Sequence, residues 1–186
     1  AIVEEMGEAM LRTAYSQILN SSRDFSIAIC DAEARLLAQA DHIPIHVGAM
    51  PFAVKAVVEA FGESIADGNV YLLNDPYYGG SHLPDFTVVV PIFADGRVIF
   101  YSVVRAHQTD IGGGTHGAYN PAATEIFHEG LRLPPLKFRD GGKYNETLVA
   151  IIRQNVRIPD AVMGDLNAQL AACNVGARRI AQLAGE

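Results

Sequence analysis

Two short segments of the sequence each place a histidine three residues before an aspartate. The first is HLPD, from His82 to Asp85, and the second is HQTD, from His107 to Asp110. Imidazole nitrogens and carboxylate oxygens are common ligands of Zn²⁺, Mn²⁺ and Fe²⁺ in catalytic sites. One such segment alone is better explained by a local hydrogen bond or a helix cap than by metal ligation. The decisive question is whether the fold brings the two segments together.

The residues between these segments predict a β-hairpin. Residues 86–93 and 98–104 are rich in β-branched and aromatic side chains, and Asp95-Gly96 between them favours a tight turn. In such a hairpin the numbers of paired residues add up to about 191, so residue 84 is expected opposite residue 107, within one residue. Both segments then lie at the open end of the hairpin, within the ~5 Å that separates adjacent strands. We therefore predict a shared metal site with an open coordination position.

A glycine-rich segment follows the second histidine–aspartate pair. Its three glycines, Gly112, Gly113 and Gly114, would let backbone amides approach an anionic substrate, and His116 would carry a proton. The alternative is that His116 is a mobile surface histidine. The segment lacks the Lys and Ser/Thr of a phosphate-binding loop, so no nucleotide site is predicted. His46, in an earlier polar cluster, is a candidate for supporting a metal ligand.

The composition indicates a globular protein that does not bind nucleic acid. Of its 186 residues, 49% are apolar and 19% are charged, which is enough to fill a core. A net charge of −7 without a Lys/Arg cluster argues against a nucleic-acid partner. The acidic amino end and the short apolar runs predict neither a signal peptide nor a membrane span, so we expect a cytoplasmic protein. Cys30 and Cys173 lack a CxxC spacing and are expected to be buried thiols.

The periodicity of apolar residues predicts an α+β fold. Helical spacing covers residues 2–19, 50–61, 148–156 and 161 to about 183, and β-rich runs cover 25–30, 36–40 and 70–73. Pro51 and Gly62 suit the first turn and the end of the second helix. Residues 121–143 are expected to be irregular. No repeat or linker divides the chain, so we predict one domain over residues 1–186: a mainly antiparallel sheet with an N-terminal helix, a middle helix and C-terminal helices.

Three longer stretches of the chain resemble the B-type subunit of the hydantoinase/oxoprolinase family. This family includes N-methylhydantoinase and is related to the acetone and acetophenone carboxylases. The stretches are RDFSIAICDAEARLLAQADHIPIHVGAMPFAV, NDPYYGGSHLPDFTVVVPIF and AHQTDIGGGTHG. Family members are several hundred residues long, so the chain resembles either an amino-terminal portion or a shortened member.

The resemblance implies a metal site made of four residues. They are Asp24, His82, Asp85 and His107. The last three are also expected from the predicted hairpin, whereas Asp24 is implied by the resemblance alone. Read from the residues, Asp24 is a cap or a strand-entry carboxylate. With these ligands assigned, Asp110 would orient a ligand or accept a proton, and we take Asp110 and His116 as the catalytic candidates.

The resemblance also implies that two subunits divide the reaction. An A-type subunit binds ATP and phosphorylates the amide or carbonyl oxygen of the substrate, and the B-type subunit completes the reaction. We expect this chain to be the metal-bearing subunit of an ATP-dependent hydrolase of cyclic amides, of the hydantoinase, 5-oxoprolinase or lactamase type. It would hold one divalent metal, Zn or Mn. Two alternatives stay open: a subunit of a ketone carboxylase, and a non-catalytic fragment with a role in assembly.

Overall fold

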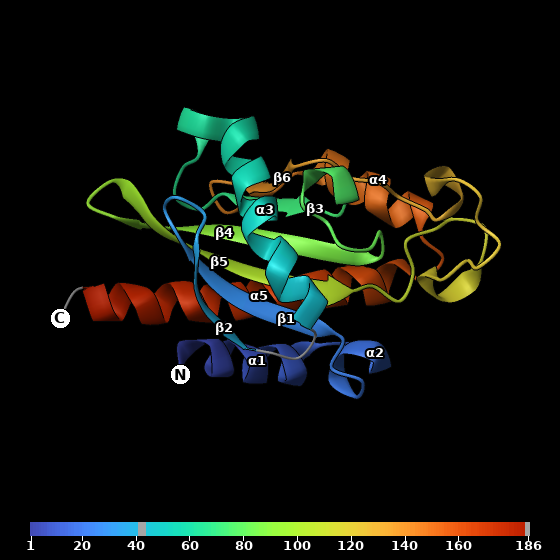
Figure 1. The fold of residues 1–186 in the computed structure, drawn as a ribbon, viewed down its shortest axis with the longest axis horizontal. Helices are drawn as coiled ribbons and strands as arrows, with labels where there is room; N and C mark the ends of the chain where they lie inside the picture. The colour runs from blue at the N-terminus through green and yellow to red at the C-terminus, as the bar shows by residue number, and fades with distance from the viewer. Residues whose placement is uncertain (41–43, 185–186) are drawn as a thin grey trace.

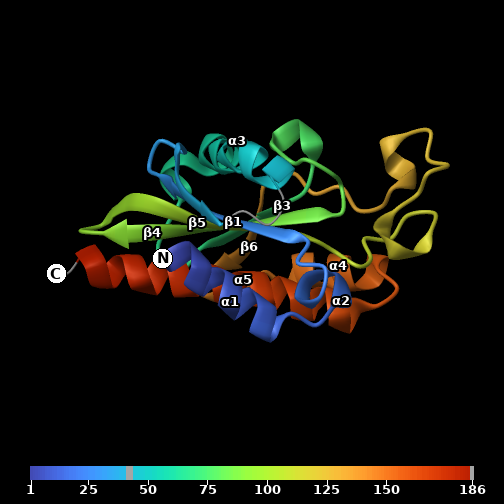
Figure 2. The same cartoon turned by 60° about the horizontal axis from the view of Figure 1, so that its bottom comes forward.

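The computed structural model of the protein describes residues 1–40 and 44–184. In these residues a seven-stranded sheet lies between two layers of helices (Figure 1). One helix covers the first face, and helices from both ends of the chain cover the second (Figure 2). The helices are α1 (Ile2–Thr13), α2 (Gln17–Asn20), α3 (Pro44–Phe61), α4 (Glu146–Asn155) and α5 (Pro159–Ala184). The strands are β1 (Phe25–Asp31), β2 (Leu36–Ala40), β3 (Val70–Leu73), β4 (Asp85–Ala94), β5 (Arg97–His107), β6 (Leu136–Asp140) and β7 (Lys143–Tyr144). The predicted α+β class is confirmed.

The strand order in the sheet is β2-β1-β5-β4-β3-β6-β7. Every neighbouring pair in this order is antiparallel, as the sequence predicted. The order places β5 between β1 and β4. The ends of these three strands therefore meet at one edge of the molecule.

The central hairpin forms as predicted, with one irregularity. Asp95 and Gly96 have φ angles of 49° and 72°, so both turn residues are left-handed, as a tight hairpin turn requires. A β-bulge between Ile92 and Phe93 then shifts the register by one residue. Because of this bulge, Asp85 rather than residue 84 lies opposite His107. The first histidine–aspartate segment thus meets His107 at the open end of the hairpin, within the predicted error of one residue.

Alternating residues of the sheet pack against the two helical layers. Met6 of α1 and Phe86 of β4 belong to a large apolar cluster with α5, and both are fully buried. Val57 of α3 and Val103 of β5 belong to a smaller cluster on the other face. Burial of each large apolar side chain contributes about 1.5–3 kcal/mol to folding. These two clusters fix the sheet between the two helical layers.

The predicted helix over residues 2–19 is interrupted. Helix α1 ends at Thr13, where Ala14 takes an extended conformation with ψ 138°. The carboxylate of Asp165 on α5 accepts hydrogen bonds from the amides of Tyr15 at 2.7 Å and Ser16 at 3.0 Å. These long-range bonds satisfy the amides that would otherwise continue the helix. Periodicity within the segment could not reveal a partner 149 residues away.

Two further predictions about secondary structure are wrong in part. Residues 121–143 include β6, which pairs with β3, and the first residue of β7. The sequence does contain a strand pattern for β6, because Leu136 and Phe138 alternate with charged residues. Prolines and glycines on either side obscured this pattern. The middle helix begins at Pro44, so Pro51 lies inside it and does not mark its first turn. Packing of α3 on the sheet outweighs the backbone hydrogen bond that a proline removes.

Both cysteines are buried free thiols, as predicted. Burial raises the pKa of Cys30 and of Cys173 to about 12, so both stay protonated at neutral pH. Among the described residues, no helix combines the length and the apolar character needed to cross a bilayer.

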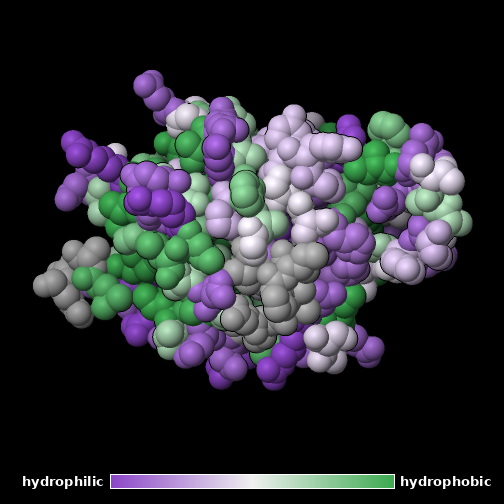
Figure 3. All heavy atoms as spheres, viewed as in Figure 1, coloured by the Kyte–Doolittle hydropathy of each residue, from purple (hydrophilic) through white to green (hydrophobic). Residues whose placement is uncertain are grey.

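An apolar pocket of about 480 Å³ lies between α1, α5 and the sheet. Ile2, Ile29, Phe100 and Leu183 are among its lining residues. Apolar side chains gather on the visible face at the carboxyl end of α5 (Figure 3). Phe100 lies toward the other end of β5 from His107, so this pocket is separate from the polar residues at the strand ends.

Candidate metal centre

Three polar residues lie in a row at one edge of the sheet. Asp24 immediately precedes β1, His107 ends β5, and Asp85 begins β4. Phe25 pairs with Ala106, and Asp85 pairs with His107, so the three side chains occupy neighbouring positions on adjacent strands. The amide of His107 also donates to the carbonyl of Asp24 at 3.0 Å. The register of the sheet alone therefore brings two carboxylates to either side of one imidazole.

His82 joins this row from the loop before β4. Its Nδ1 lies 3.7 Å from Oδ1 of Asp85, and Nδ1 of His107 lies 3.1 Å from the same oxygen. The two imidazole rings are stacked, with their centroids 5.3 Å apart. One donor atom from each of these three residues lies within 4.8 Å of the other two. This spacing and this donor set suit a divalent cation.

Asp24 lies at the margin of this group. Its Oδ2 is 4.0 Å from Nδ1 of His107, and its Oδ1 is 3.9 Å from Nε2 of His46. The Asp24 side chain is 29% exposed, against 1% for Asp85. Asp24 therefore faces the group from its more open side.

His46 lies in the first turn of α3 and contacts the same carboxylate. Its Nε2 is 3.2 Å from Oδ2 of Asp85, and its side chain is 4% exposed. Its other ring nitrogen has no hydrogen-bond partner in the described part of the chain. The sequence suggested His46 only as a supporting residue, and the structure places it in direct contact with Asp85. We refer to Asp24, His46, His82, Asp85 and His107 as the edge cluster.

The charge on Asp85 is stabilised by the imidazoles around it. Burial alone would raise its pKa, but contacts with His107, His46 and His82 outweigh burial and hold the pKa well below the usual range. The same contact with Asp85 raises the pKa of the His82 imidazole above its ordinary value. A metal ion would have to displace a proton from a ligating imidazole. Metal affinity is therefore expected to fall as the pH decreases.

The loop that carries His82 is held by buried backbone contacts. Asn74 donates from Nδ2 to the carbonyls of Leu83 at 2.6 Å and Leu131 at 2.8 Å. Gly79 has a φ of 86°, and a side chain there would lie 2.4 Å from the backbone nitrogen of Ala53 in α3. Only glycine allows the loop to approach the helix this closely. The His82 loop is thus fixed against both α3 and the segment that precedes β6.

Asp110 is held by a different set of partners. Its carboxylate accepts from the amide of Gly112 at 3.1 Å, from Nη1 of Arg157 at 3.1 Å and from the Arg157 amide. Arg157 also donates from Nη2 to the carbonyl of Gly113 at 2.7 Å. Within the described residues, Asp110 makes no hydrogen bond or ion pair with His82, Asp85 or His107. The structure therefore places Asp110 as an anchor of the glycine-rich segment.

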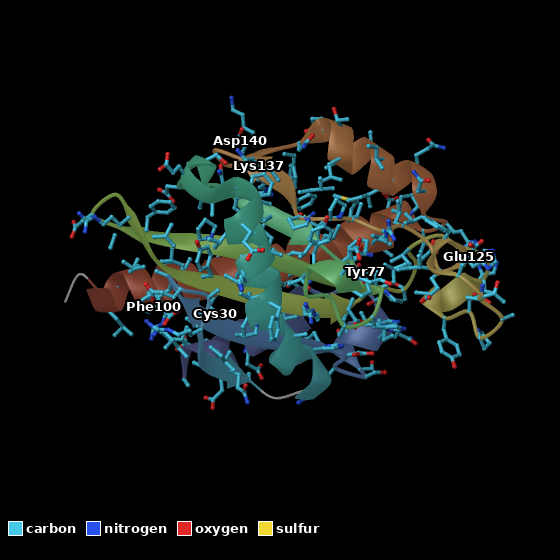
Figure 4. The ribbon with its side chains drawn as sticks, turned by 45° about the horizontal axis from the view of Figure 1, so that its top comes forward. Cys30, Tyr77, Phe100, Glu125, Lys137 and Asp140 are labelled. Carbon is cyan, nitrogen blue, oxygen red and sulfur yellow. The ribbon has the colours of Figure 1, made fainter. Side chains whose placement is uncertain are left out.

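His116 lies in the same segment and is exposed. The segment packs closely on residues 128–131: the amide of Gly114 donates to the carbonyl of His128 at 3.0 Å. Figure 1 shows this part of the chain extending past the edge of the sheet at which the cluster lies. In the view of Figure 4, Glu125 on this extension lies farther out than Tyr77 of the His82 loop. The structure does not bring His116 into contact with the described edge cluster.

Sequence reasoning missed two charged residues near this region. Arg157 binds the glycine-rich segment from the turn between α4 and α5. Glu129 acts on His82, raising the pKa of its imidazole together with Asp85 and Asp24. Neither residue belongs to a local motif, and no pattern in the sequence points to them.

The chain is similar in sequence and in fold to several known proteins. It is 40% identical to the caprolactamase subunit beta of Pseudomonas jessenii over 179 residues, which is 96% of this chain and 31% of that subunit. The crystal structure of the ATP-dependent caprolactamase from Pseudomonas jessenii matches 98% of this chain and 31% of that one, with a TM-score of 0.92 and 40% identity. This chain therefore spans about a third of the length of that caprolactamase subunit.

A second solved structure shares the fold at lower identity. The nucleotide-free acetone carboxylase matches 99% of this chain and 24% of its own, with a TM-score of 0.92 and 22% identity. The family model described as hydantoinase B/oxoprolinase matches residues 1–186. The chain belongs to the hydantoinase B/oxoprolinase family.

Proposed function

We propose that this chain carries the metal centre of an ATP-dependent hydrolase of cyclic amides. The observation that carries the proposal is the convergence of two imidazoles and a buried carboxylate, His82, His107 and Asp85, at one edge of the sheet. The similarity to an ATP-dependent caprolactamase supports a lactam-type substrate. The partner would be an A-type subunit that uses ATP to activate the amide oxygen.

One divalent ion, Zn²⁺ or Mn²⁺, fits the donor set of the edge cluster. His82, Asp85 and His107 would hold it, with Asp24 as a fourth ligand from the more exposed side. Three or four protein ligands that leave a position open are typical of catalytic sites and not of structural ones. A bound ion would supply Lewis-acid chemistry toward the reacting oxygen.

The protein residues would prepare and protect the reaction. Asp85 holds both imidazoles at fixed distances, so the donor atoms need little rearrangement on metal binding. Its burial keeps water away from the inner side of the site. Asp110 and His116 are proposed to move protons during ring opening, from a segment that Arg157 holds in place.

We propose hydrolysis and not carboxylation because the caprolactamase is more similar in sequence to this chain than the acetone carboxylase is. The caprolactamase structure is 40% identical to this chain, whereas the likeness to acetone carboxylase, at 22% identity, concerns the fold. Both reactions begin with an oxygen activated by ATP and both suit the same ligands. A substrate screen decides between them, because cyclic amides and ketones give different products.

The direct test of this function is an assay of ring opening with and without an A-type subunit. We expect ring opening only when the chain, the A-type subunit and ATP are all present. We also expect no ATP hydrolysis by the chain alone, since its glycine-rich segment lacks the Lys and Ser/Thr of a phosphate-binding loop. Ring opening by the isolated chain without ATP would contradict the proposal and indicate an ordinary metal-dependent cyclic amidase.

The proposed proton transfer by Asp110 has its own test. Asp110→Asn is expected to lower turnover by about 10²-fold or more while metal content stays unchanged. Arg157→Ala is the matched variant, because it removes the partner that anchors Asp110 but keeps the carboxylate. Equal losses of turnover in both variants would show that Asp110 only holds the glycine-rich segment. Loss of metal in Asp110→Asn would make it a ligand.

A further inference from the structure

Arg105 is a fully buried charged residue directly behind the edge cluster. It lies two residues before His107 on β5, so both side chains point to the same face of the sheet. Its exposure is 0%, and it pairs across the sheet with Thr87 of β4. Lysine and arginine are almost never fully buried unless specific partners compensate. The hydrogen-bond partners of Arg105 therefore indicate which parts of the structure this buried group holds in place.

The guanidinium group of Arg105 binds three separate segments of the chain. Its Nε donates to Oγ1 of Thr87 at 2.8 Å, and its Nη2 donates to the carbonyl of Gly79 at 2.6 Å. Its Nη1 lies 3.3 Å from the carbonyl of His46 and 3.4 Å from Oγ of Ser81. Gly79 and Ser81 belong to the loop that carries His82, and His46 belongs to α3. One side chain thus fixes the two segments that bring His46 and His82 to Asp85.

Ser81 links this buried cation to the carboxylate of the site. Its hydroxyl accepts from Arg105 and donates to Oδ2 of Asp85 at 2.9 Å. Nε2 of His46 reaches the same Oδ2 at 3.2 Å. The other oxygen, Oδ1, faces His107 and His82. The two oxygens of Asp85 therefore have different partners: the protein holds Oδ2, and Oδ1 points toward the two candidate ligands.

We propose that Arg105, Ser81 and His46 form a positioning unit that fixes the Asp85 carboxylate, with Oδ2 bound by the protein and Oδ1 presented to the metal. The part of this inference that presents Oδ1 to a metal rests on the proposed metal centre. The hydrogen bonds that hold the Asp85 carboxylate do not depend on that proposal. A hydrogen bond to the second oxygen fixes the orientation of a ligating carboxylate. Arg105 is a positioning residue, because it acts through Ser81 and through the two segments.

The chemistry of arginine is required at this position. Burial lowers the pKa of Arg105 to about 10, while the nearby Asp85 opposes this change, so the group stays charged at neutral pH. Its planar fork reaches acceptors in three directions at once. A lysine at this position would keep the charge but could not satisfy the same carbonyls and hydroxyls. The structure thus predicts that Arg105→Lys is not a conservative change.

The test uses the metal-free chain and Co²⁺ as the probe, with Ser81→Ala and Arg105→Lys as variants. Ser81→Ala is expected to weaken Co²⁺ binding about 10-fold, and Arg105→Lys about 10- to 100-fold. Both should change the visible absorption bands of bound Co²⁺. Before metal is added, both should also shift the imidazole ¹H–¹⁵N resonances of the edge cluster. Ser102→Ala is the control, because Ser102 is a fully buried serine of β5 whose hydroxyl faces Met6.

The two measurements separate this inference from the proposed function. If the wild-type chain binds no Co²⁺, the proposed metal centre is wrong. The positioning unit is then tested by the imidazole resonances of the metal-free chain, which should still shift in Ser81→Ala and Arg105→Lys. If Ser81→Ala has the affinity, absorption bands and resonances of the wild type, the positioning unit is overturned, whether or not Arg105→Lys folds. Equal effects in Ser102→Ala would also overturn it, because they would reflect a general loss of packing.

Discussion

Replacing Asp85 with alanine is expected to cost the metal-free chain about 3–5 kcal/mol of folding free energy. Asp85 is 1% exposed and contacts three imidazoles and the Ser81 hydroxyl. Without the carboxylate, the buried donors around it lose their common acceptor, and each unsatisfied group costs free energy. The free energy of unfolding, measured by urea denaturation in the presence of a chelator, checks this prediction.

A matched control separates the role of Asp85 from the loss of any carboxylate. Asp67 is exposed and, among the residues that the structure describes, accepts a hydrogen bond only from the amide of Gly68, so Asp67→Ala should leave stability nearly unchanged. Asp85→Ala should also fail to bind metal, because the carboxylate nearest to both imidazoles is gone. Wild-type stability of Asp85→Ala would show that the contacts around Asp85 are not energetically important.

His107→Ala is expected to abolish ATP-coupled ring opening in the assembled complex. His107 lies at the centre of the row, between Asp24 and Asp85, and it is one of the three residues whose donor atoms converge. Its side chain is only 12% exposed, but it lies at the end of β5 and not in the apolar core. The chain should therefore still fold and assemble. Product formation with the A-type subunit and ATP is the measurement.

His128→Ala serves as the control for this substitution. His128 is about half exposed and pairs with Glu125 on the projecting segment, and it is not one of the three residues whose donor atoms converge. Its loss should change turnover little, since an exposed ion pair contributes at most about 1 kcal/mol. Full turnover in His107→Ala would show that the reaction does not need His107 and that other residues carry it out.

The hairpin, and the approach of His82 and Asp85 to His107 that follows from it, could be predicted from the sequence because both depend on local signals. Alternating β-formers and the Asp95-Gly96 turn fix which residues pair, and the register then places His82 and Asp85 near His107. The bulge after Ile92 was not predictable, but it moved the pairing by only one residue. Residues on neighbouring strands stay close together when the register changes by one residue, so the site could still be predicted.

The contacts that support the site could not be predicted because they join distant segments. His46 reaches Asp85 from α3, and Arg157 reaches Asp110 from the turn after α4. Asp165 similarly ends α1 from a helix at the other end of the chain. Each contact depends on how whole elements pack, and periodicity within one segment carries no information about that. For the same reason, the sequence suggested a proton-transfer role for Asp110 and did not reveal its anchor.

The metal content of the purified chain tests the central claim most directly. After incubation with Zn²⁺ or Mn²⁺ and removal of the excess ion, elemental analysis should find about one divalent ion per wild-type chain. His82→Ala should lose that ion, since His82 supplies one of the three converging donor atoms. A wild-type chain without bound metal, or equal occupancy in wild type and His82→Ala, would contradict the metal centre.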